Sequence, residues 1–166
     1  MTHSTDFWST AEAADDDHWF LGTLATVKAS AARTGGALSV VEFLHPPGFA
    51  TPQHVHHGAD EAFYVLSGSI QGFFGDQTWE AGEGSFVWLP RDVPHGYSVD
   101  DGAPVRTLAI TLPGGFDEFV VELGGPAGAH GLPPVLEMPD VATMLAVGAR
   151  HDIEVVGPPR PRRPGS

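Results

Sequence analysis

Short apolar stretches alternate with turn signals through most of the chain, beginning at Trp19. The stretches are rich in branched and aromatic residues and are separated by Gly, Pro and Asp, which is typical of β-strands joined by tight turns. No helical periodicity interrupts them, so the pattern favours an all-β sandwich or barrel over an alternating α/β sheet. The predicted strands cover residues 20–27, 37–45, 53–56, 61–66, 69–74, 78–80, 85–89, 95–99 and 105–111.

Helical periodicity begins only after these strands. The first helical pattern has apolar residues at i, i+3, i+4 and i+7 and stops at a glycine pair; it comprises Phe116, Phe119, Val120 and Leu123, followed by Gly124 and Gly125. A second pattern starts from Asp140 as a helix N-cap and carries one apolar stripe, Val141, Met144 and Leu145. We therefore expect two short helices docked on a β core.

Composition divides the chain into four segments. Residues 1–18 form an acidic N-terminal arm, 19–113 the β core, 114–156 a helical extension packed on that core, and 157–166 a flexible tail rich in Pro and Arg. These boundaries follow the changes in hydrophobic pattern and in turn-residue density.

Acidic residues dominate the charge. Asp and Glu number 21 against 8 Lys and Arg, which gives a formal net charge of −13. Such a chain repels phosphate backbones and anionic lipid surfaces, so we expect neither a nucleic-acid partner nor a membrane partner. The chain has no cysteine, which excludes disulfides and thiolate ligands. Its N-terminal residues lack the pattern of a signal peptide, and we expect a cytoplasmic protein.

Histidines on one predicted strand indicate a metal site. His54 and His56 are two residues apart and project from the same strand face, whereas His57 must point the other way. Residues 58–60 can turn the chain, so that Glu61 on the next strand returns toward the two histidines. A single histidine is more often a surface or core residue than a ligand. Two imidazoles and a carboxylate converging from rigid strands favour a transition-metal site.

The spacing of these residues resembles the two motifs of the cupin superfamily. The first motif reads Gly48, five residues, His54-Val55-His56, four residues, Glu61, six residues, Gly68. The second reads Gly84, five residues, Pro90, and then His95. Asp92 stands where the second motif prefers glycine and Val99 where it ends in Asn. Asp tolerates a left-handed turn better than most residues do, and the Asn affects barrel packing more than metal binding.

The cupin resemblance implies both a fold and a cofactor. The implied fold is the double-stranded β-helix, a jelly-roll barrel, here with two short C-terminal helices. The implied ligands of one divalent transition metal ion are His54, His56, Glu61 and His95. Three imidazoles and one carboxylate suit Fe, Mn, Co, Ni, Cu and Zn alike, so the metal's identity stays open. Residues 60–66 and 112–124 further resemble bacterial monocupins that are like quercetin 2,3-dioxygenase.

Residues near the expected ligands form the candidate pocket. Aromatic and branched side chains would line it: Phe43, Phe49, Phe63, Val65, Phe73, Phe86, Trp88 and Tyr97. His57 and Asp60, each next to a ligand in sequence, are candidates for orienting a ligand histidine, and His45 could line the same cavity. Basic residues are scarce near the site, which disfavours phosphorylated substrates.

Three functions remain open on this evidence. The leading hypothesis is a dioxygenase that acts on a phenolic or flavonol-type molecule. This apolar aromatic substrate would react with dioxygen, and Glu61 would accept the proton of the substrate's hydroxyl group. The first alternative is a non-redox cyclase, isomerase or lyase that acts on a natural-product intermediate. The second is a cupin that binds a small molecule without catalysis. The resemblance also implies a homodimer formed through edge strands.

Overall fold

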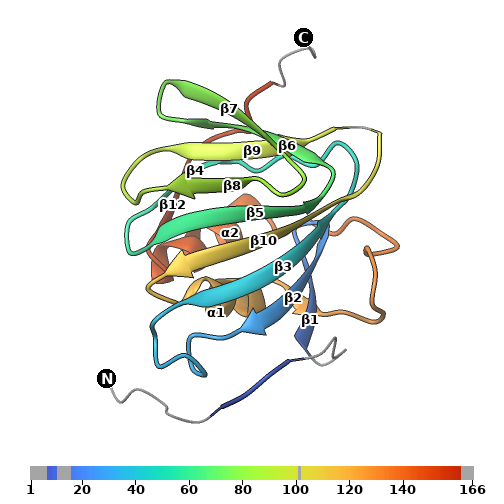
Figure 1. The fold of residues 1–166 in the computed structure, drawn as a ribbon, viewed down its shortest axis with the longest axis vertical. Coiled ribbons are helices and arrows are strands. Elements are labelled where there is room, and N and C mark those ends of the chain that lie inside the picture. The colour runs from blue at the N-terminus through green and yellow to red at the C-terminus, as the bar shows by residue number, and fades with distance from the viewer. Residues whose placement is uncertain (1–6, 11–15, 101, 162–166) are drawn as a thin grey trace.

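Two antiparallel β-sheets form the body of the protein in the computed structural model, which describes residues 7–10, 16–100 and 102–161 (Figure 1). The seven-stranded sheet has the order β11 (Gly125–Pro126), β1 (Asp17–Phe20), β2 (Thr23–Ala29), β3 (Ser39–His45), β10 (Val105–Leu112), β5 (Asp60–Ser67) and β8 (Phe86–Leu89). The five-stranded sheet has the order β12 (Ile153–Gly157), β4 (Gln53–His56), β9 (His95–Val99), β6 (Ser69–Phe74) and β7 (Gln77–Gly82).

The predicted jelly-roll class is confirmed. Strand β3 shows how its sequence produces the sandwich, because its buried and half-buried residues alternate strictly along its length. The inward set includes Val41 and Phe43, which join the core together with Val65 of β5 and Val99 of β9. Val99, at the motif position that usually holds Asn, is fully buried. It therefore contributes to the packing of the barrel.

The predicted strand over residues 20–27 is in fact a hairpin. Strands β1 and β2 pair antiparallel, with Phe20 opposite Thr23. The two residues between them, Leu21 and Gly22, have positive φ values of 49° and 81°. Positive φ at both central positions is the requirement of a type I′ turn, which glycine meets without strain. The prediction was wrong because Gly22 was not taken as a turn residue.

Both helices form, but the second packs differently from expectation. Helix α1 (Phe116–Leu123) buries Phe119 and Val120. Helix α2 (Val141–Arg150) begins at the predicted cap, since the Asp140 carboxylate accepts a hydrogen bond from the Thr143 N–H at 2.8 Å.

The expected apolar stripe of α2 does not form its buried face. Val141 and Leu145 are 65% and 45% exposed, and the helix instead buries Val147 and Gly148. A Cβ at Gly148 would lie 2.7 Å from the Ile153 carbonyl oxygen. The missing side chain therefore lets the C-terminal half of α2 approach β12 closely.

The C-terminal segment contains an unpredicted strand. Within the expected helical extension, β12 pairs with β4 and places Ile153 opposite His56 and Val155 opposite His54. The expected flexible tail also begins within this strand, at Gly157, and Arg160 beyond it lies 3.5 Å above the Phe73 ring. Residues 162–166 and most of the acidic arm lie outside the described part of the chain.

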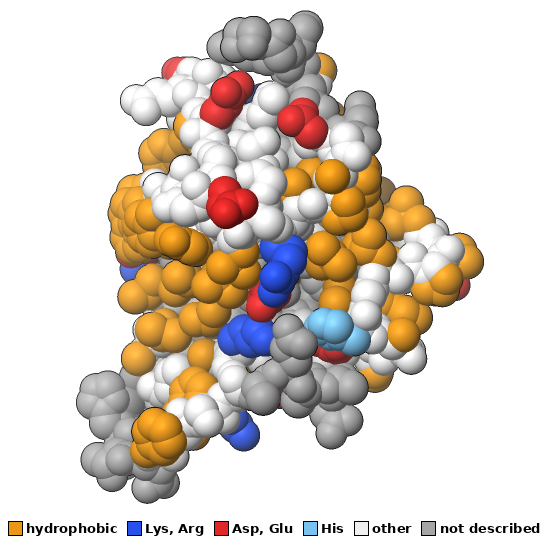
Figure 2. All heavy atoms as spheres, turned by 45° about the vertical axis from the view of Figure 1, so that its right-hand side comes forward, with side chains coloured by type: hydrophobic (Ala, Val, Ile, Leu, Met, Phe, Trp, Pro, Cys, Tyr) orange, Lys and Arg blue, Asp and Glu red, His pale blue; other side chains and the backbone are white. Residues whose placement is uncertain are grey.

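Surface charge and apolar area are unevenly distributed. On the face shown in Figure 2, hydrophobic side chains cover broad areas and basic side chains are few. Two of the basic residues, Lys28 and Arg106, both form ion pairs with Glu42. Within the part of the chain that the structure describes, neither helix is long and apolar enough to cross a membrane.

Candidate metal centre

Four side chains from three strands converge inside the barrel. His54 and His56 come from β4, His95 from β9 and Glu61 from β5. His54 and His95 are direct partners across the β4–β9 pair, whereas Glu61 reaches the cluster from the opposite sheet. One potential ligand atom from each residue lies within 4.8 Å of every other. The sequence spacing predicted this meeting of side chains, and the structure brings them together.

Backbone carbonyls orient two of the imidazoles. The Nδ1–H of His54 donates to the Pro52 carbonyl oxygen at 2.8 Å, and the Nδ1–H of His95 donates to the Val93 carbonyl oxygen at 2.9 Å. Since only an N–H can bond to a carbonyl oxygen, these contacts fix the proton on Nδ1 and leave Nε2 for the cluster. Such support for the outer nitrogen is the usual arrangement of metal-binding histidines.

The nitrogen of His56 that faces the cluster has no hydrogen-bond partner among the residues that the structure describes. His56 is 4% exposed, and its Nε2 lies 3.5 Å from Glu61 Oε2. Leaving a buried polar atom without a partner is costly, and a divalent cation would satisfy it. The donor set, its burial and this free nitrogen all fit a transition metal ion.

Burial and mutual charge set the protonation of the cluster. Burial, reinforced by the neighbouring histidines, lowers the pKa of His54 to about 3, so this imidazole is neutral at pH 7. Burial alone would raise the pKa of Glu61, but His56 and the hydrogen bond from His95 outweigh it and hold that pKa at about 2. A neutral imidazole and an ionised carboxylate are the forms that bind metal.

His95 and Glu61 form a hydrogen-bonded pair. His95 Nε2 lies 3.0 Å from Glu61 Oε2. Burial opposes a charge on His95, but the hydrogen bond and the charge of Glu61 prevail and raise the His95 pKa. A metal ion that binds here therefore replaces a proton on His95.

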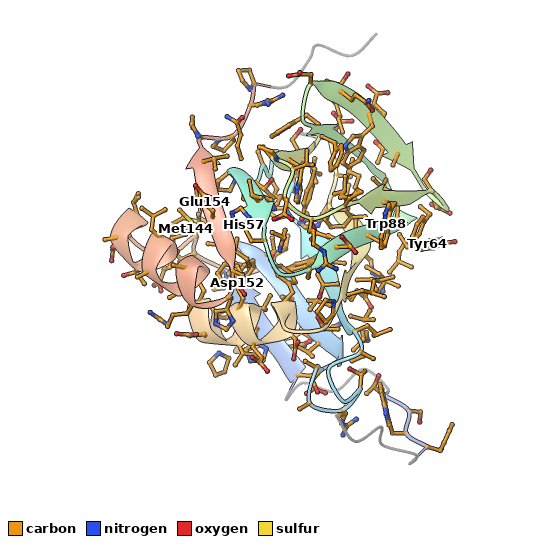
Figure 3. All side chains as sticks on the ribbon, turned by 90° about the vertical axis from the view of Figure 1, so that its left-hand side faces the viewer. His57, Tyr64, Trp88, Met144, Asp152 and Glu154 are labelled. Carbon is orange, nitrogen blue, oxygen red and sulfur yellow. The ribbon has the colours of Figure 1, made fainter. Side chains whose placement is uncertain are left out.

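His57 and Asp60, the candidates for orienting a ligand histidine, form their hydrogen bonds with residues other than the proposed ligands. His57 points outward, as strand alternation predicts, and bonds Asp92 Oδ1 at 3.0 Å and Glu154 Oε2 at 2.8 Å (Figure 3). Asp60 accepts hydrogen bonds from the backbone N–H and the guanidinium of Arg91. Asp60 thus fixes the loop that leads to His95, and Pro52 and Val93 provide the orienting oxygens.

Asp92 adopts the conformation predicted for the glycine position of the second motif. Its φ is 67°, in the left-handed region. Its backbone N–H donates to the His56 carbonyl oxygen at 2.9 Å. This turn ties the loop before β9 to the end of β4.

A cavity of about 70 Å³ adjoins the cluster. Of the expected pocket residues, Phe43, Phe49, Phe63 and Tyr97 line it. The other four do not. Val65 is fully buried elsewhere in the core, and Phe73 lies under the Arg160 guanidinium.

Phe86 and Trp88 lie on the outer face of the seven-stranded sheet, 60% and 48% exposed. Trp88 pairs with Ala62, and Phe86 pairs with Tyr64. Figure 3 shows Trp88 and Tyr64 together on the opposite side of the molecule from Met144. These aromatic residues therefore cannot wall the cavity.

Several lining residues were missed: two belong to the first hairpin, two to the loop before β4, and the others follow the predicted β core. They are Phe20, Leu21, Thr51, Pro52, Phe116, Phe119, Met144, Ile153 and Val155. The apolar periodicity of residues 116–123 could have indicated Phe116 and Phe119, but no local signal marks the others as neighbours of the ligands.

His45 lies behind the cavity wall. It is fully buried, stacks with Phe43 and Phe49 at ring-centroid distances of 5.4 and 4.8 Å, and places Nε2 3.1 Å from Thr107 Oγ1. Burial lowers its pKa to about 3, so His45 is neutral. It supports the aromatic wall, whereas the sequence suggested that it could line the cavity itself.

Known proteins support this interpretation of the fold. A protein-family model described as Cupin domain matches residues 41–111, which include all four clustered side chains. Residues 41–111 are a cupin domain. Quercetin 2,3-dioxygenase from Bacillus subtilis is 28% identical to this chain over 123 residues, which are 74% of the chain and 36% of that protein. An uncharacterized protein from Methanocaldococcus jannaschii is 25% identical over 75 residues, 45% of the chain and 60% of that protein.

Solved structures share the fold. The polyketide cyclase RemF from Streptomyces resistomycificus superposes with a TM-score of 0.55 at 24% identity, covering 64% of this chain and 80% of RemF. Oxalate decarboxylase from Bacillus subtilis superposes with a TM-score of 0.56 at 20% identity, covering 68% of this chain and 31% of the decarboxylase. The chain spans only part of the length of the curated relatives it matches.

Proposed function

We propose that this cupin is a mononuclear metal-dependent dioxygenase that acts on a phenolic substrate. One observation carries the proposal. The buried cluster of three histidines and one glutamate lies next to a cavity that has aromatic and aliphatic walls. The 28% identity to a quercetin 2,3-dioxygenase supports the choice of reaction.

The cavity wall favours a neutral, flat substrate. Among the described residues that line the cavity, none is Lys or Arg. A phosphate or an extended polyanion would therefore lack a paired cation, whereas an aromatic ring would pack against Phe43, Phe63 and Phe116. Tyr97 lines the same wall, and its buried hydroxyl lies 3.4 Å from Nε2 of His45 behind that wall.

Each residue of the cluster has a definite task in this reaction. His54, His56, His95 and Glu61 would hold one divalent ion, which when bound supplies Lewis-acid and redox chemistry. Glu61, ionised because its pKa is held at about 2, would accept the proton of the phenolic hydroxyl at a carboxylate oxygen. The aromatic wall excludes water and orients the electron-rich ring toward dioxygen. Both oxygen atoms enter the product, and the ring supplies the electrons, so no external reductant is consumed.

Oxygen uptake tests the proposal. Purified protein is stripped with a chelator and reloaded separately with Fe, Mn, Co, Ni, Cu or Zn, and oxygen consumption is followed with single-ring phenols and with flavonols. Uptake with at least one redox-active metal, abolished in Glu61→Gln and accompanied by entry of ¹⁸O from labelled dioxygen into the product, is the expected result. Turnover that continues at the same rate under argon would replace the proposal with a non-redox reaction.

A further inference from the structure

The walls of the cavity come from two different parts of the chain. The metal cluster and the inner aromatic wall belong to the cupin domain, residues 41–111. The outer wall is built by the segments before and after it: Phe20, Leu21, Phe116, Phe119, Met144, Ile153 and Val155. The size of the space beside the cluster is therefore set in part by residues outside the matched domain.

This space is small for the proposed substrate class. The cavity measures about 70 Å³, whereas typical small-molecule pockets measure about 300–1,000 Å³. A single phenolic ring meets the walls closely, and a flavonol, with three rings, exceeds the space several times over. Admission of a larger ligand therefore requires one wall residue to move.

Four of the wall residues are fixed in place by the core. Phe43, Phe63 and Tyr97 are buried on paired strands of the two sheets. Phe119 packs edge-on against Phe20, with ring centroids 5.5 Å apart, and is 7% exposed. Moving any of these side chains would disturb the core of the sandwich.

Met144 is held differently. It lies in the N-terminal half of α2, where its neighbours Val141 and Leu145 are exposed. The residues before this half, 127–140, form neither helix nor strand. The helix is secured at its other end, where Val147 is buried and Arg150 and His151 both pair with Glu122. The methionine side chain is itself unbranched and adaptable.

We propose that Met144 closes the metal cavity and sets the size of the phenolic ligand that this cupin admits. The proposal rests on the proposed function, because it takes the cavity to be the binding site of that substrate. It makes Met144 a specificity-determining residue, which acts by filling space.

Ligand binding to the zinc-loaded protein tests this role, since zinc is not redox-active and no turnover interferes. Affinities for catechol, 1-naphthol and 3-hydroxyflavone are measured by calorimetry for the wild type and for Met144→Ala. Matched controls are Met138→Ala, a methionine that is 54% exposed, and Leu145→Ala, the next residue of the same helix, 45% exposed. Neither control residue lines the cavity.

The expected result is a selective gain for large ligands. Met144→Ala should bind 3-hydroxyflavone at least about tenfold more tightly than the wild type, with catechol changed by less than about threefold. Both controls should match the wild type. Met144→Trp, which fills the same space without leaving a void, should weaken binding of 1-naphthol by about tenfold or more.

Two results would overturn the assignment. One is an affinity for 3-hydroxyflavone that is the same in Met144→Ala as in Met138→Ala, and the other is unchanged 1-naphthol binding in Met144→Trp. The failure of the proposed function is seen separately, as absent oxygen uptake in the redox-metal assay. A shifted size preference with no oxygen uptake would keep Met144 as the size filter and refute only the dioxygenase reaction.

Discussion

Two adjacent histidines at the end of β4 allow the ligand assignment to be tested, because one faces the metal cluster and the other faces outward. His56 points into the barrel with an unpartnered Nε2 and is 4% exposed. His57, the next residue, points outward and pairs with Asp92 and Glu154. His56→Ala should therefore remove a metal donor, whereas His57→Ala, an identical change one position away, should leave the donors in place.

The size of the effect follows from the number of donors. Four-donor zinc sites in small domains bind with about 10–16 kcal/mol, so one of four donors contributes roughly 3 kcal/mol. Its loss lowers metal affinity by about 100-fold or more. The described contacts of His57, to Asp92 and Glu154, lie at the surface, and its loss should change metal affinity by less than about threefold.

Competition with a chromophoric chelator measures both affinities in the same buffer. Far-ultraviolet circular dichroism checks that each variant remains folded, and elemental analysis gives the metal content of each purified protein. Equal metal affinity of His56→Ala and His57→Ala would refute the ligand assignment.

Two further predictions concern the C-terminal helices. Asp140→Ala should lower the free energy of unfolding by about 1 kcal/mol, because the cap to the Thr143 N–H is lost; urea denaturation measures it, and an unchanged midpoint would contradict the cap. Glu122→Gln should lower the melting temperature at pH 7 by weakening the contacts to Arg150 and His151. The hydrogen bond from His151, together with Arg150, depresses the pKa of Glu122 below its ordinary value of 4.5. The wild-type advantage is therefore present above pH 4.5 and should vanish as the pH falls through the lower folded pKa; an advantage that grows in acid would contradict this assignment.

The sequence was sufficient to predict the fold class and the meeting of the four cluster residues. Strand periodicity places His54 and His56 on one face, and the motif spacing adds Glu61 and His95. The first two placements and the return of Glu61 depend on local strand and turn geometry, whereas the jelly roll and the role of His95 are what the resemblance to the cupin motifs implies.

The cavity walls were less predictable, because strand alternation defines two sets of residues without saying which set faces inward. On β8 the inward set is Val87 and Leu89, so Phe86 and Trp88 face outward. Strand β12 was missed for a related reason: residues 153–157 form a strand because β4 offers them a free edge. Met144 lies at the cavity because α2 packs against distant parts of the chain, and no local sequence pattern predicts that packing.

Anomalous diffraction from crystals of the metal-loaded protein tests the central claim most directly. A single peak should lie about 2.0–2.2 Å from Nε2 of His54, His56 and His95 and from one carboxylate oxygen of Glu61. A fully loaded crystal with no peak among these four side chains, and with His56 Nε2 bonded instead to water or to a protein group, would contradict the account.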